Sequence, residues 1–335
     1  MKILQVITSL STGGAEKLIS EIAPLLRDKG HQVDVLAFDG EDTAFKKALI
    51  DKGIKVYSFG KGCNVYNPLF IFRLAKMMKN YDIVHTHNTS NRRRDWKCYA
   101  WIDKWMYSRY DKIICISNQA EDNLRKYLPN VKNVCTIFNG VDINRFHNAK
   151  SLDSLKSNKE IVAMVAGFRY QKDQDTLIKA FTHLDKDKYE LWLVGDGERR
   201  PVLENLVKEL GLTDNVKLLG VRNDIPNVLQ TADIIVMSSH FEGLSLSNIE
   251  GMSVNKPFIA SNVDGLREVV DGYGVLFPHE DDKALASIIQ NLSEDTDRYQ
   301  QVAAKCWERA QMFDIQKMVD AYNEVYMGLM TPKHN

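Results

Sequence analysis

Twelve short apolar runs recur along this chain of 335 residues, and segments with helical spacing follow many of them. The first run covers residues 3–7, and Leu18, Ile22 and Leu26 behind it fall on one helical face. Continuous apolar strands of this length are covered on both faces, as in a parallel sheet with crossover helices. The alternation therefore predicts an α/β fold.

The expected strands form two groups of six, and a polar stretch rich in Lys, Ser and Asn separates the groups. We expect strands at residues 3–7, 33–38, 55–58, 82–85, 112–117 and 133–137, and then at 161–166, 190–194, 216–219, 234–238, 257–261 and 274–277. Two groups with their helices predict two doubly wound sheets. We assign an N-terminal domain to residues 1–147, a linker to 148–160, a C-terminal domain to 161–311 and a final helix to 312–335.

Charge and composition narrow the classes of function. The 44 basic and 44 acidic residues balance, so nothing global indicates a nucleic-acid partner. No apolar run approaches the roughly 20 residues of a membrane span, and residues 1–6 begin a strand rather than a signal peptide. The five cysteines contain no Cys-x-x-Cys pair, which argues against a disulfide framework or a zinc site. We therefore expect a cytoplasmic enzyme.

The stretch 239–252 carries two carboxylates, Glu242 and Glu250, on either side of a turn rich in Gly and Ser. The turn follows the apolar run 232–237, and the second carboxylate falls in an expected helix. A strand, a small-residue turn and a helix start suit a phosphate group, because unpaired N–H groups and the helix dipole face it. Glu250 could then accept hydrogen bonds from sugar hydroxyls. The alternative is that Glu250 only complements the helix dipole.

Similar small or charged residues follow other expected strands. They are Gly13 and Gly14, Arg169 and Lys172, Gly195 to Gly197, and Asp264, Gly265 and Glu268. In a parallel α/β sheet, ligands bind at the carboxyl ends of the strands. These residues are therefore expected to face one ligand site.

With these motifs the chain resembles the retaining glycosyltransferases of family 4, also called glycosyl transferases group 1. The resemblance rests on Gly13-Gly14-Ala15-Glu16, Asn139-Gly140-Val141-Asp142, Lys172 and the Glu-x7-Glu pair, and it covers nearly the whole chain. It implies the GT-B fold, in which two doubly wound Rossmann-like domains face each other across a cleft. It also implies that the final helix packs back on the N-terminal domain.

The resemblance implies transfer of a sugar from a nucleotide-diphosphate sugar to a glycan or lipid-linked acceptor, with retention of configuration, in surface polysaccharide synthesis. It assigns the catalytic roles to Lys172, Glu242, His87 and Arg169. The usual family arginine falls on Gly167, so Arg169 acts from a shifted position. The residues expected to bind the donor are Gly13, Gly14, Arg222, Gly243, Leu244, Ser245, Leu246, Ser247 and Glu250.

No Asp-x-Asp pair stands where a metal would bridge the diphosphate, so we expect no metal and no further cofactor. The donor site needs cations and N–H donors aimed at the leaving oxygens instead. Uridine diphosphate sugars are the commonest donors of the resembled family and are the expected donor class.

The segment 92–112 interleaves basic residues with aromatic ones and leaves two alternatives open. Trp101 and Trp105 have helical spacing, which favours a helix buried against the sheet. The same composition suits peripheral contact with the inner face of a membrane, where a lipid-linked acceptor lies. Arg92, Arg93 and Arg94 are candidates for binding an acceptor phosphate.

Between His87 and Asn91 the family pattern carries a helix and a further strand that this sequence lacks. Either the domain has lost both elements, or residues are missing from the sequence. We favour missing residues, because loss of a strand from the middle of a sheet breaks its core.

Two other functions stay open, and one is disfavoured. A nicotinamide dehydrogenase needs Gly-x-Gly-x-x-Gly at the first turn, and residues 9–14 do not provide it. A nucleotide-sugar epimerase on the same fold and a non-catalytic nucleotide-sugar-binding protein share the donor site and remain alternatives.

Overall fold

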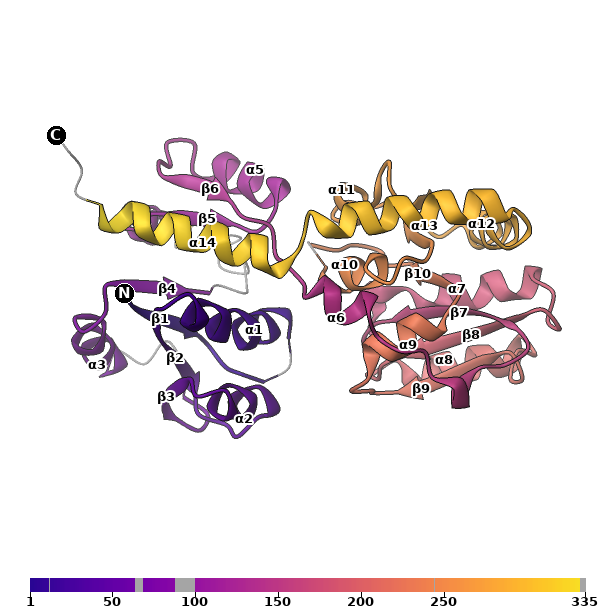
Figure 1. The fold of residues 1–335 in the computed structure, drawn as a ribbon, viewed down its shortest axis with the longest axis horizontal. Coiled ribbons are helices and arrows are strands. Elements are labelled where there is room, and N and C mark those ends of the chain that lie inside the picture. Colours follow the sequence, from indigo (N-terminus) through magenta and orange to yellow (C-terminus); the bar gives the residue numbers. More distant parts are fainter. Residues whose placement is uncertain (12, 64–68, 88–99, 244, 332–335) are drawn as a thin grey trace. The chain divides into compact units, whose positions relative to one another are not determined.

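The computed structural model describes residues 1–11, 13–63, 69–87, 100–243 and 245–331. The chain forms two compact units (Figure 1). The first unit contains Met1–Asn139 together with Ile315–Asn335, and the second contains Gly140–Asp314. A strand lies within two residues of each of the twelve expected positions, and every ladder is parallel. The predicted α/β class is therefore confirmed.

The first unit contains a parallel sheet with the order β3-β2-β1-β4. Its strands are β1 (Lys2–Ile7), β2 (Gln32–Asp39), β3 (Lys55–Gly60) and β4 (Ile83–Thr86). One face packs on α1 (Gly14–Asp28), α2 (Ala44–Asp51) and α14 (Ile315–Met330), and the other packs on α3 (Leu69–Met78). The central strand β1 is buried on both faces.

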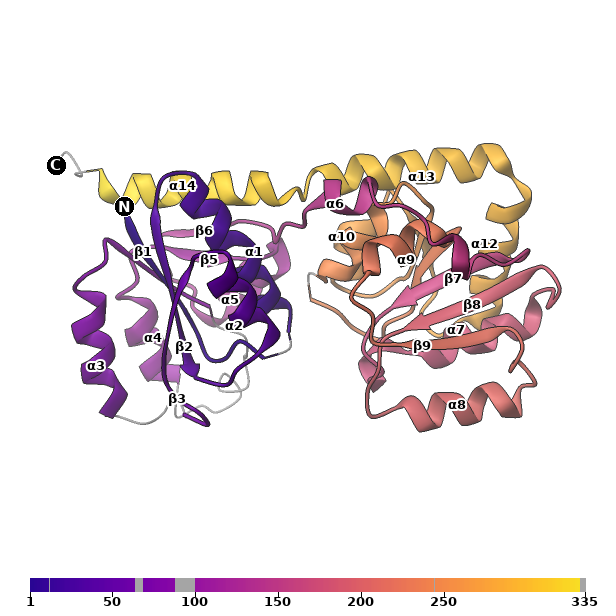
Figure 2. The ribbon, with the colours of Figure 1, turned by 60° about the horizontal axis from the view of Figure 1, so that its bottom comes forward.

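Helix α14 completes the core of the first unit, although the whole second unit precedes it in the chain. Its Val319, Tyr322 and Tyr326 are buried in one cluster with Ile3 and Ile19. Figures 1 and 2 both show α14 lying along the first unit beside β5 and β6. This helix therefore belongs to the hydrophobic core rather than to a tail.

Strands β5 (Ile113–Cys115) and β6 (Val134–Thr136) form a separate two-stranded sheet. With α5 (Asn118–Tyr127) they bury Cys115 and Leu124. Within the described residues, no strand connects β4 to β5. The gap expected between His87 and Asn91 lies outside the described residues.

Helix α4 (Ala100–Tyr107) corrects one of the two readings of the basic and aromatic segment. Trp101 is 70% exposed and Trp105 is 60% exposed, so their spacing does not reflect a buried face. The reading as a helix buried through these two tryptophans is wrong. Arg92, Arg93 and Arg94 lie outside the described residues.

The second unit contains a six-stranded parallel sheet with the order β12-β11-β10-β7-β8-β9. Its strands are β7 (Glu160–Val165), β8 (Tyr189–Val194), β9 (Val216–Gly220), β10 (Ile234–Met237), β11 (Phe258–Ser261) and β12 (Val275–Phe277). The chain builds the sheet outward from β7 in one direction and then outward from β10 in the other. This is the doubly wound order, and its switch point lies between β7 and β10.

Helices cover both faces of this sheet (Figure 2). One face carries α7 (Gln174–Ala180), α8 (Arg200–Glu209) and α12 (Asp282–Glu294). The other carries α9 (Ile225–Thr231), α10 (Leu246–Met252) and α13 (Thr296–Gln311), and the shorter α6 (Ile143–His147) and α11 (Leu266–Val270) contact them. Because both faces are covered, the four residues of β10 are all buried. None of the described helices is long and apolar enough to cross a membrane.

Candidate functional site

Two loops meet at the switch point of the second unit. The loop after β7 leads through a short 3-10 helix, Tyr170–Lys172, into α7, and the loop after β10 leads into α10. The backbone N–H of His240 donates to the carbonyl of Gln171 at 2.8 Å. The hydroxyl of Ser238 donates to the carbonyl of Asp173 at 2.7 Å. These bonds hold the two loops together.

Lys172 and Glu242 form an ion pair across these loops. Their side chains are only 17% and 6% exposed, respectively. Ser239 also donates to the Glu242 carboxylate at 2.8 Å, and Gln171 donates to the carbonyl of Phe241 at 2.9 Å. The sequence predicted both charged residues as site members, and the structure brings them together.

Gly265 supports the backbone that carries Glu242. A Cβ at Gly265 would lie 2.2 Å from the carbonyl oxygen of Glu242, and the residue has φ +83°. Both the space and the left-handed backbone therefore require glycine here. The loop after β11 thus fixes the position of the loop after β10.

Helix α10 begins at Leu246 next to the ion-paired loop, as the sequence predicted. Glu250 is 5% exposed, and Ser245 precedes the helix without capping it through its side chain. Asn248 is fully buried, and neither atom of its amide has a hydrogen-bond partner among the described residues. Gly243, Ser245, Leu246 and Ser247 lie in this loop and helix start, and Leu244 lies outside the described residues.

The two predicted arginines are placed differently. Arg169 is exposed just before the 3-10 helix, and within the described ranges it makes no ion pair. Arg222 follows β9 and binds the Asp224 carboxylate through Nε at 2.8 Å and through a terminal nitrogen at 2.6 Å. This hydrogen bond lowers the pKa of Asp224. The charge of Arg222 is therefore already matched within its own loop.

The remaining predicted residues belong to the first unit. Gly13 and Gly14 mark the start of α1 directly beyond the loop after β1, and no side chain caps that helix. His87 follows β4, and its Nε2 lies 2.7 Å from the amide oxygen of Gln5. Because an amide oxygen only accepts, Nε2 of His87 carries the proton.

His87 stacks on His85 with 4.3 Å between ring centroids. His85 Nδ1 lies 2.6 Å from the hydroxyl of Tyr326 on α14. Burial lowers the pKa of His85 to about 4, and burial together with His85 lowers the pKa of His87 well below its ordinary value. His87 is therefore neutral near pH 7 and leaves Nδ1 as an acceptor for a hydroxyl group.

Several polar residues that hold the site were not predicted. Gln5, Gln171 and Ser239 orient His87 or Glu242, and Asn248 is buried beside Ser247. Only one of these residues could have been noticed in the sequence, because Gln5 is a polar residue inside the apolar run 3–7. The others depend on loop conformation, which residue spacing does not encode.

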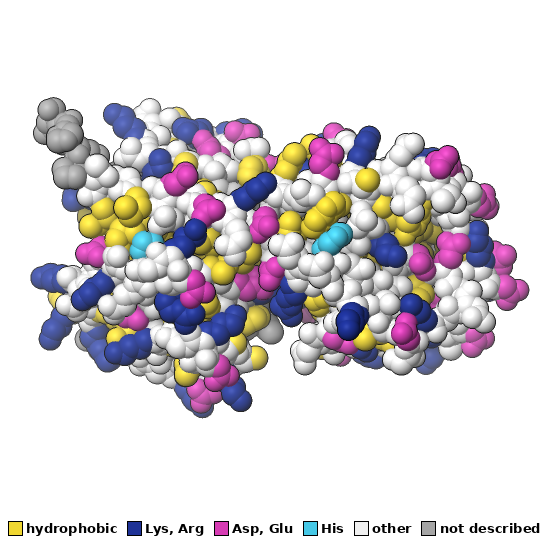
Figure 3. All heavy atoms as spheres, viewed as in Figure 1, with side chains coloured by type: hydrophobic (Ala, Val, Ile, Leu, Met, Phe, Trp, Pro, Cys, Tyr) yellow, Lys and Arg dark blue, Asp and Glu magenta, His cyan; other side chains and the backbone are white. Residues whose placement is uncertain are grey.

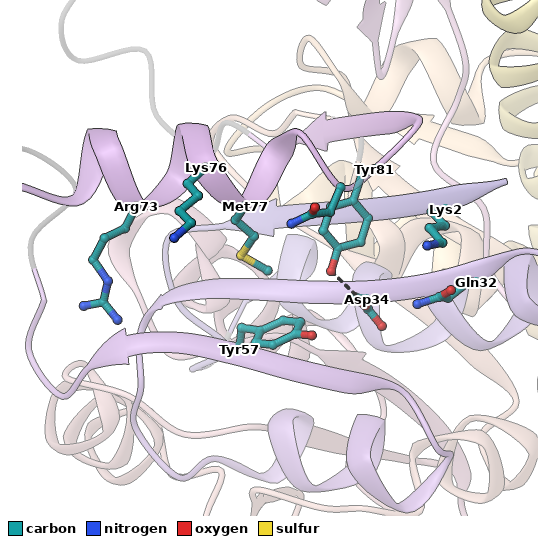
Figure 4. Close-up of a pocket in the computed structure, with 9 residues that line it drawn as sticks. Lys2, Gln32, Asp34, Tyr57, Arg73, Lys76, Met77 and Tyr81 are labelled. Atoms are coloured by element: carbon teal, nitrogen blue, oxygen red, sulfur yellow. Dashed lines mark hydrogen bonds between the residues drawn. The ribbon is translucent and has the colours of Figure 1, made fainter.

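A cavity of about 550 Å³ lies elsewhere, in the first unit (Figure 4). Lys2 and Gln32 line it at the amino ends of β1 and β2, whereas Gly13 and His87 follow the carboxyl ends of β1 and β4. Arg73 and Lys76 reach it from α3, and Tyr81 donates to Asp34 at 2.6 Å. Figure 3 shows that lysine and arginine side chains are frequent on the lower part of the visible face of the first unit. The cavity is not part of the predicted site.

Two family models match the chain, and together they cover most of it. The model described as glycosyl transferases group 1 matches residues 148–309. The model described as glycosyltransferase family 4 matches residues 12–92 and 88–145. This second match consists of two segments that overlap at residues 88–92, in the region where the sequence predicts that a helix and a strand are absent.

Two of the similar curated proteins are named as glycosyltransferases of glycan synthesis. The chain is 26% identical over 312 residues to an Escherichia coli protein named UDP-Gal:alpha-D-GlcNAc-diphosphoundecaprenol alpha-1,3-galactosyltransferase, with 78% of this chain and 79% of that protein covered. It is 24% identical over 359 residues to the O-antigen biosynthesis glycosyltransferase WbnH of Escherichia coli, with 96% and 98% covered. This second alignment is longer than the whole chain, so WbnH contains residues that have no counterpart here.

Solved structures confirm the fold. Anabaena Alr3699/HepE in complex with UDP superposes with a TM-score of 0.85 at 24% identity, covering 98% of this chain and 100% of that chain. A glycosyltransferase from Rickettsia africae gives a TM-score of 0.83 at 23% identity, covering 100% of this chain and 99% of that chain. The predicted GT-B fold is therefore confirmed.

Replacement of Gly265 by alanine should destabilise the second unit. The new methyl group meets the Glu242 carbonyl in a left-handed conformation, so we expect a loss of at least about 2 kcal/mol in the free energy of unfolding. Urea titration followed by circular dichroism measures it. Gly328→Ala is the matched control, because a Cβ there meets nothing within 4 Å. Equal stability of the two variants would contradict the proposed support of Glu242.

The histidine pair predicts a loss of stability in mild acid. An unfolded histidine titrates near pH 6.5, whereas folded His85 titrates at about 4, so stability falls as the pH drops through this window. The contribution of His85 reaches about 3 kcal/mol at the low end. Thermal unfolding from pH 7 to pH 4.5 should show a smaller decrease for His85→Asn than for the unchanged protein. An identical pH dependence would exclude His85 as the cause.

Proposed function

The chain belongs to the glycosyl transferases group 1 and to glycosyltransferase family 4, and from this membership we propose that it transfers a sugar from a UDP-sugar to a lipid-linked or growing glycan. The names of the relatives support this substrate class. The Escherichia coli galactosyltransferase is named for UDP-Gal and a diphosphoundecaprenol acceptor, and WbnH is named for O-antigen biosynthesis. HepE was solved with UDP and with UDP-glucose.

The Lys172–Glu242 ion pair at the switch point is the observation that carries the proposal. Cleavage of the donor leaves a diphosphate with additional negative charge, and a nearby ammonium group stabilises that charge. In the ligand-free chain Glu242 neutralises Lys172. We propose that the diphosphate attracts Lys172 and that Glu242 then accepts hydrogen bonds from the transferred sugar. Lys172 thereby acts more strongly on the transition state than on the bound donor.

The other contacts follow from the same placement. Amides at the start of α10 bind the distal phosphate, and Glu250 binds the ribose hydroxyls. Nδ1 of His87 accepts a hydrogen bond from a sugar hydroxyl, since Nε2 already donates to Gln5. Gly13 and Gly14 offer backbone amides at the start of α1. Arg169, which is exposed, supplies further positive charge to the phosphates.

We propose retention at the anomeric carbon without a metal. In this mechanism the leaving phosphate deprotonates the acceptor hydroxyl on the same face of the sugar. The sequence supports it through the absence of an Asp-x-Asp pair where a metal would bridge the diphosphate. Lys172 provides the positive charge that a metal supplies in other transferases.

The exposed face of α4 supports contact with a membrane that carries the acceptor. Trp101 and Trp105 are largely exposed, and the guanidinium of Arg109 lies 5.3 Å from the centroid of the Trp105 ring. Amphipathic aromatic side chains beside basic ones suit the interface of an anionic membrane. We propose that residues 100–112 approach the inner face of the membrane, where a lipid-linked acceptor is accessible.

The test is a transfer assay with UDP-sugars and a diphosphate-linked lipid acceptor, with the anomeric configuration of the product read by NMR. We expect an axial donor to give an axial product, at a rate that EDTA changes less than about twofold. Inversion of configuration would contradict retention, and loss of activity in EDTA that added magnesium or manganese restores would contradict a metal-independent transfer step. Conversion of the donor without acceptor would indicate an epimerase, and binding without turnover would indicate a non-catalytic protein.

Two variants separate turnover from donor binding. Lys172→Ala should lower kcat by about 100-fold to 1000-fold, as expected for loss of a group that stabilises developing charge. Glu250→Gln should mainly raise the KM for the donor, because ribose contacts are equal in the ground and transition states. Lys208→Ala, an exposed lysine on α8, is the control. Full activity of both site variants would refute the assignment.

A further inference from the structure

Four side chains of types that can bind metal converge beside the ion-paired loops of the second unit. They are Asp173 at the start of α7, His240 after β10, and His279 and Glu280 after β12. Around His240 Nδ1, the His279 Nε2 atom lies at 2.9 Å, a Glu280 oxygen at 3.3 Å and an Asp173 oxygen at 3.7 Å. The side chains come from three different loops, so the cluster does not result from sequence proximity alone.

Hydrogen bonds among these four side chains leave lone pairs that a cation could share. Neutral His240 has at most one proton on Nδ1, and that proton can point to only one neighbour, while His279 Nε2 donates or accepts according to its tautomer. The Asp173 carboxylate accepts from the N–H and the hydroxyl of Thr176 and keeps further lone pairs. One cation at the centre would interact with lone pairs of all four groups at once.

The distances also match a known coordination geometry. Zinc–nitrogen and zinc–oxygen bonds of about 2.0–2.2 Å in a tetrahedron place neighbouring ligand atoms about 3.3 Å apart. The observed separations from His240 Nδ1 run from 2.9 to 3.7 Å, Glu280 and His279 are separated by 4.0 Å, and the ligand atoms of Asp173, His240 and His279 all lie within 4.8 Å of one another. A bound ion would draw the longer of these separations in by rotation of the exposed His279 and Glu280 side chains. We propose that Asp173, His240, His279 and Glu280 form a binding site for a divalent transition metal of the zinc class. Two imidazoles and two carboxylates favour such ions over calcium or magnesium.

The surroundings orient the ligands as metal sites require. The Asp173 carboxylate accepts from the hydroxyl of Thr176 at 2.7 Å, and the ring of Tyr170 lies 4.5 Å from that of His240. Outer contacts of this kind fix ligand geometry. Asp173 and Glu280 also have positive φ values, 46° and 62°. Such conformations are uncommon outside glycine and concentrate at functional sites.

This site is distinct from the metal-independent chemistry proposed above. Asp173 directly follows Lys172, and His240 lies two residues before Glu242. A bound ion therefore ties the loop after β12 to the two loops that hold the ion pair. The metal would stabilise these loops and does not need to contact the diphosphate.

Zinc titration of the intact, tag-free protein by isothermal calorimetry tests the site. We expect one ion per chain, with a dissociation constant in the micromolar range or below and a rise in the melting temperature. Cobalt substitution should give the visible absorption bands of a tetrahedral ion. Failure to bind zinc with this stoichiometry would overturn the proposal.

Variants show whether these residues are the ligands. His279→Ala removes an exposed imidazole and Glu280→Gln replaces an exposed carboxylate with an amide, so folding should be preserved, and each should weaken zinc binding at least about 10-fold. His183→Ala is the control, because its ring pairs with the single carboxylate of Asp282 in the same unit. Unchanged affinity in the two ligand variants would assign the ion to another position. The readout is binding, so its result does not depend on the transferase proposal.

Discussion

The reversal of strand order between β7 and β10 is the constraint on which the second unit depends. Neighbouring strands that send their chains to opposite faces of a sheet leave their carboxyl ends uncovered by helices. The polar groups there must find partners in the loops themselves. Hydrogen bonds from His240 to Gln171 and from Ser238 to Asp173 meet this demand. They also bring Lys172 and Glu242 together.

The same constraint explains why glycine stands where loops cross. The loop after β11 passes so close to Glu242 that Gly265 has no room for a side chain. The loop after β8 passes the loop after β7 just as closely, because a Cβ at Gly195 would lie 2.1 Å from the carbonyl oxygen of Ala166. The charged residues are therefore held by stacked backbone segments. A site built in this way is positioned before any ligand binds.

Strand positions could be predicted from the sequence because a short, continuous apolar run indicates a strand that is buried on both faces. The core strands at residues 161–166 and 234–238 were found within one residue, since both faces of each strand are covered. The residue pattern wrongly predicted that Trp101 and Trp105 are buried. Helical spacing shows that two residues share a face of a helix, but it does not show whether that face is covered. The pattern also gave no indication of the cluster around His240. That cluster unites residues 107 positions apart in the chain, from Asp173 to Glu280, through loop geometry.

Within the site, the charged residues were predictable and their supports were not. Lys172 and Glu242 stand out by type and by their place after apolar runs. Ser239 and Gln171 do not stand out, because polar residues are ordinary in any loop. The sequence also did not show that the charge of Arg222 is paired, since its hydrogen bond to Asp224 depends on the turn after β9.

The place of α14 has a consequence for the order in which the protein can form. The second unit, Gly140–Asp314, is continuous in the chain and is complete before α14 is synthesised. The first unit is discontinuous, and its core lacks Tyr322 and Tyr326 until the last helix arrives. Gln5 and His85 therefore contact the hydroxyl of Tyr326 only after the last helix has been made. The first unit begins the chain, yet its core can be completed only when synthesis of the chain has ended.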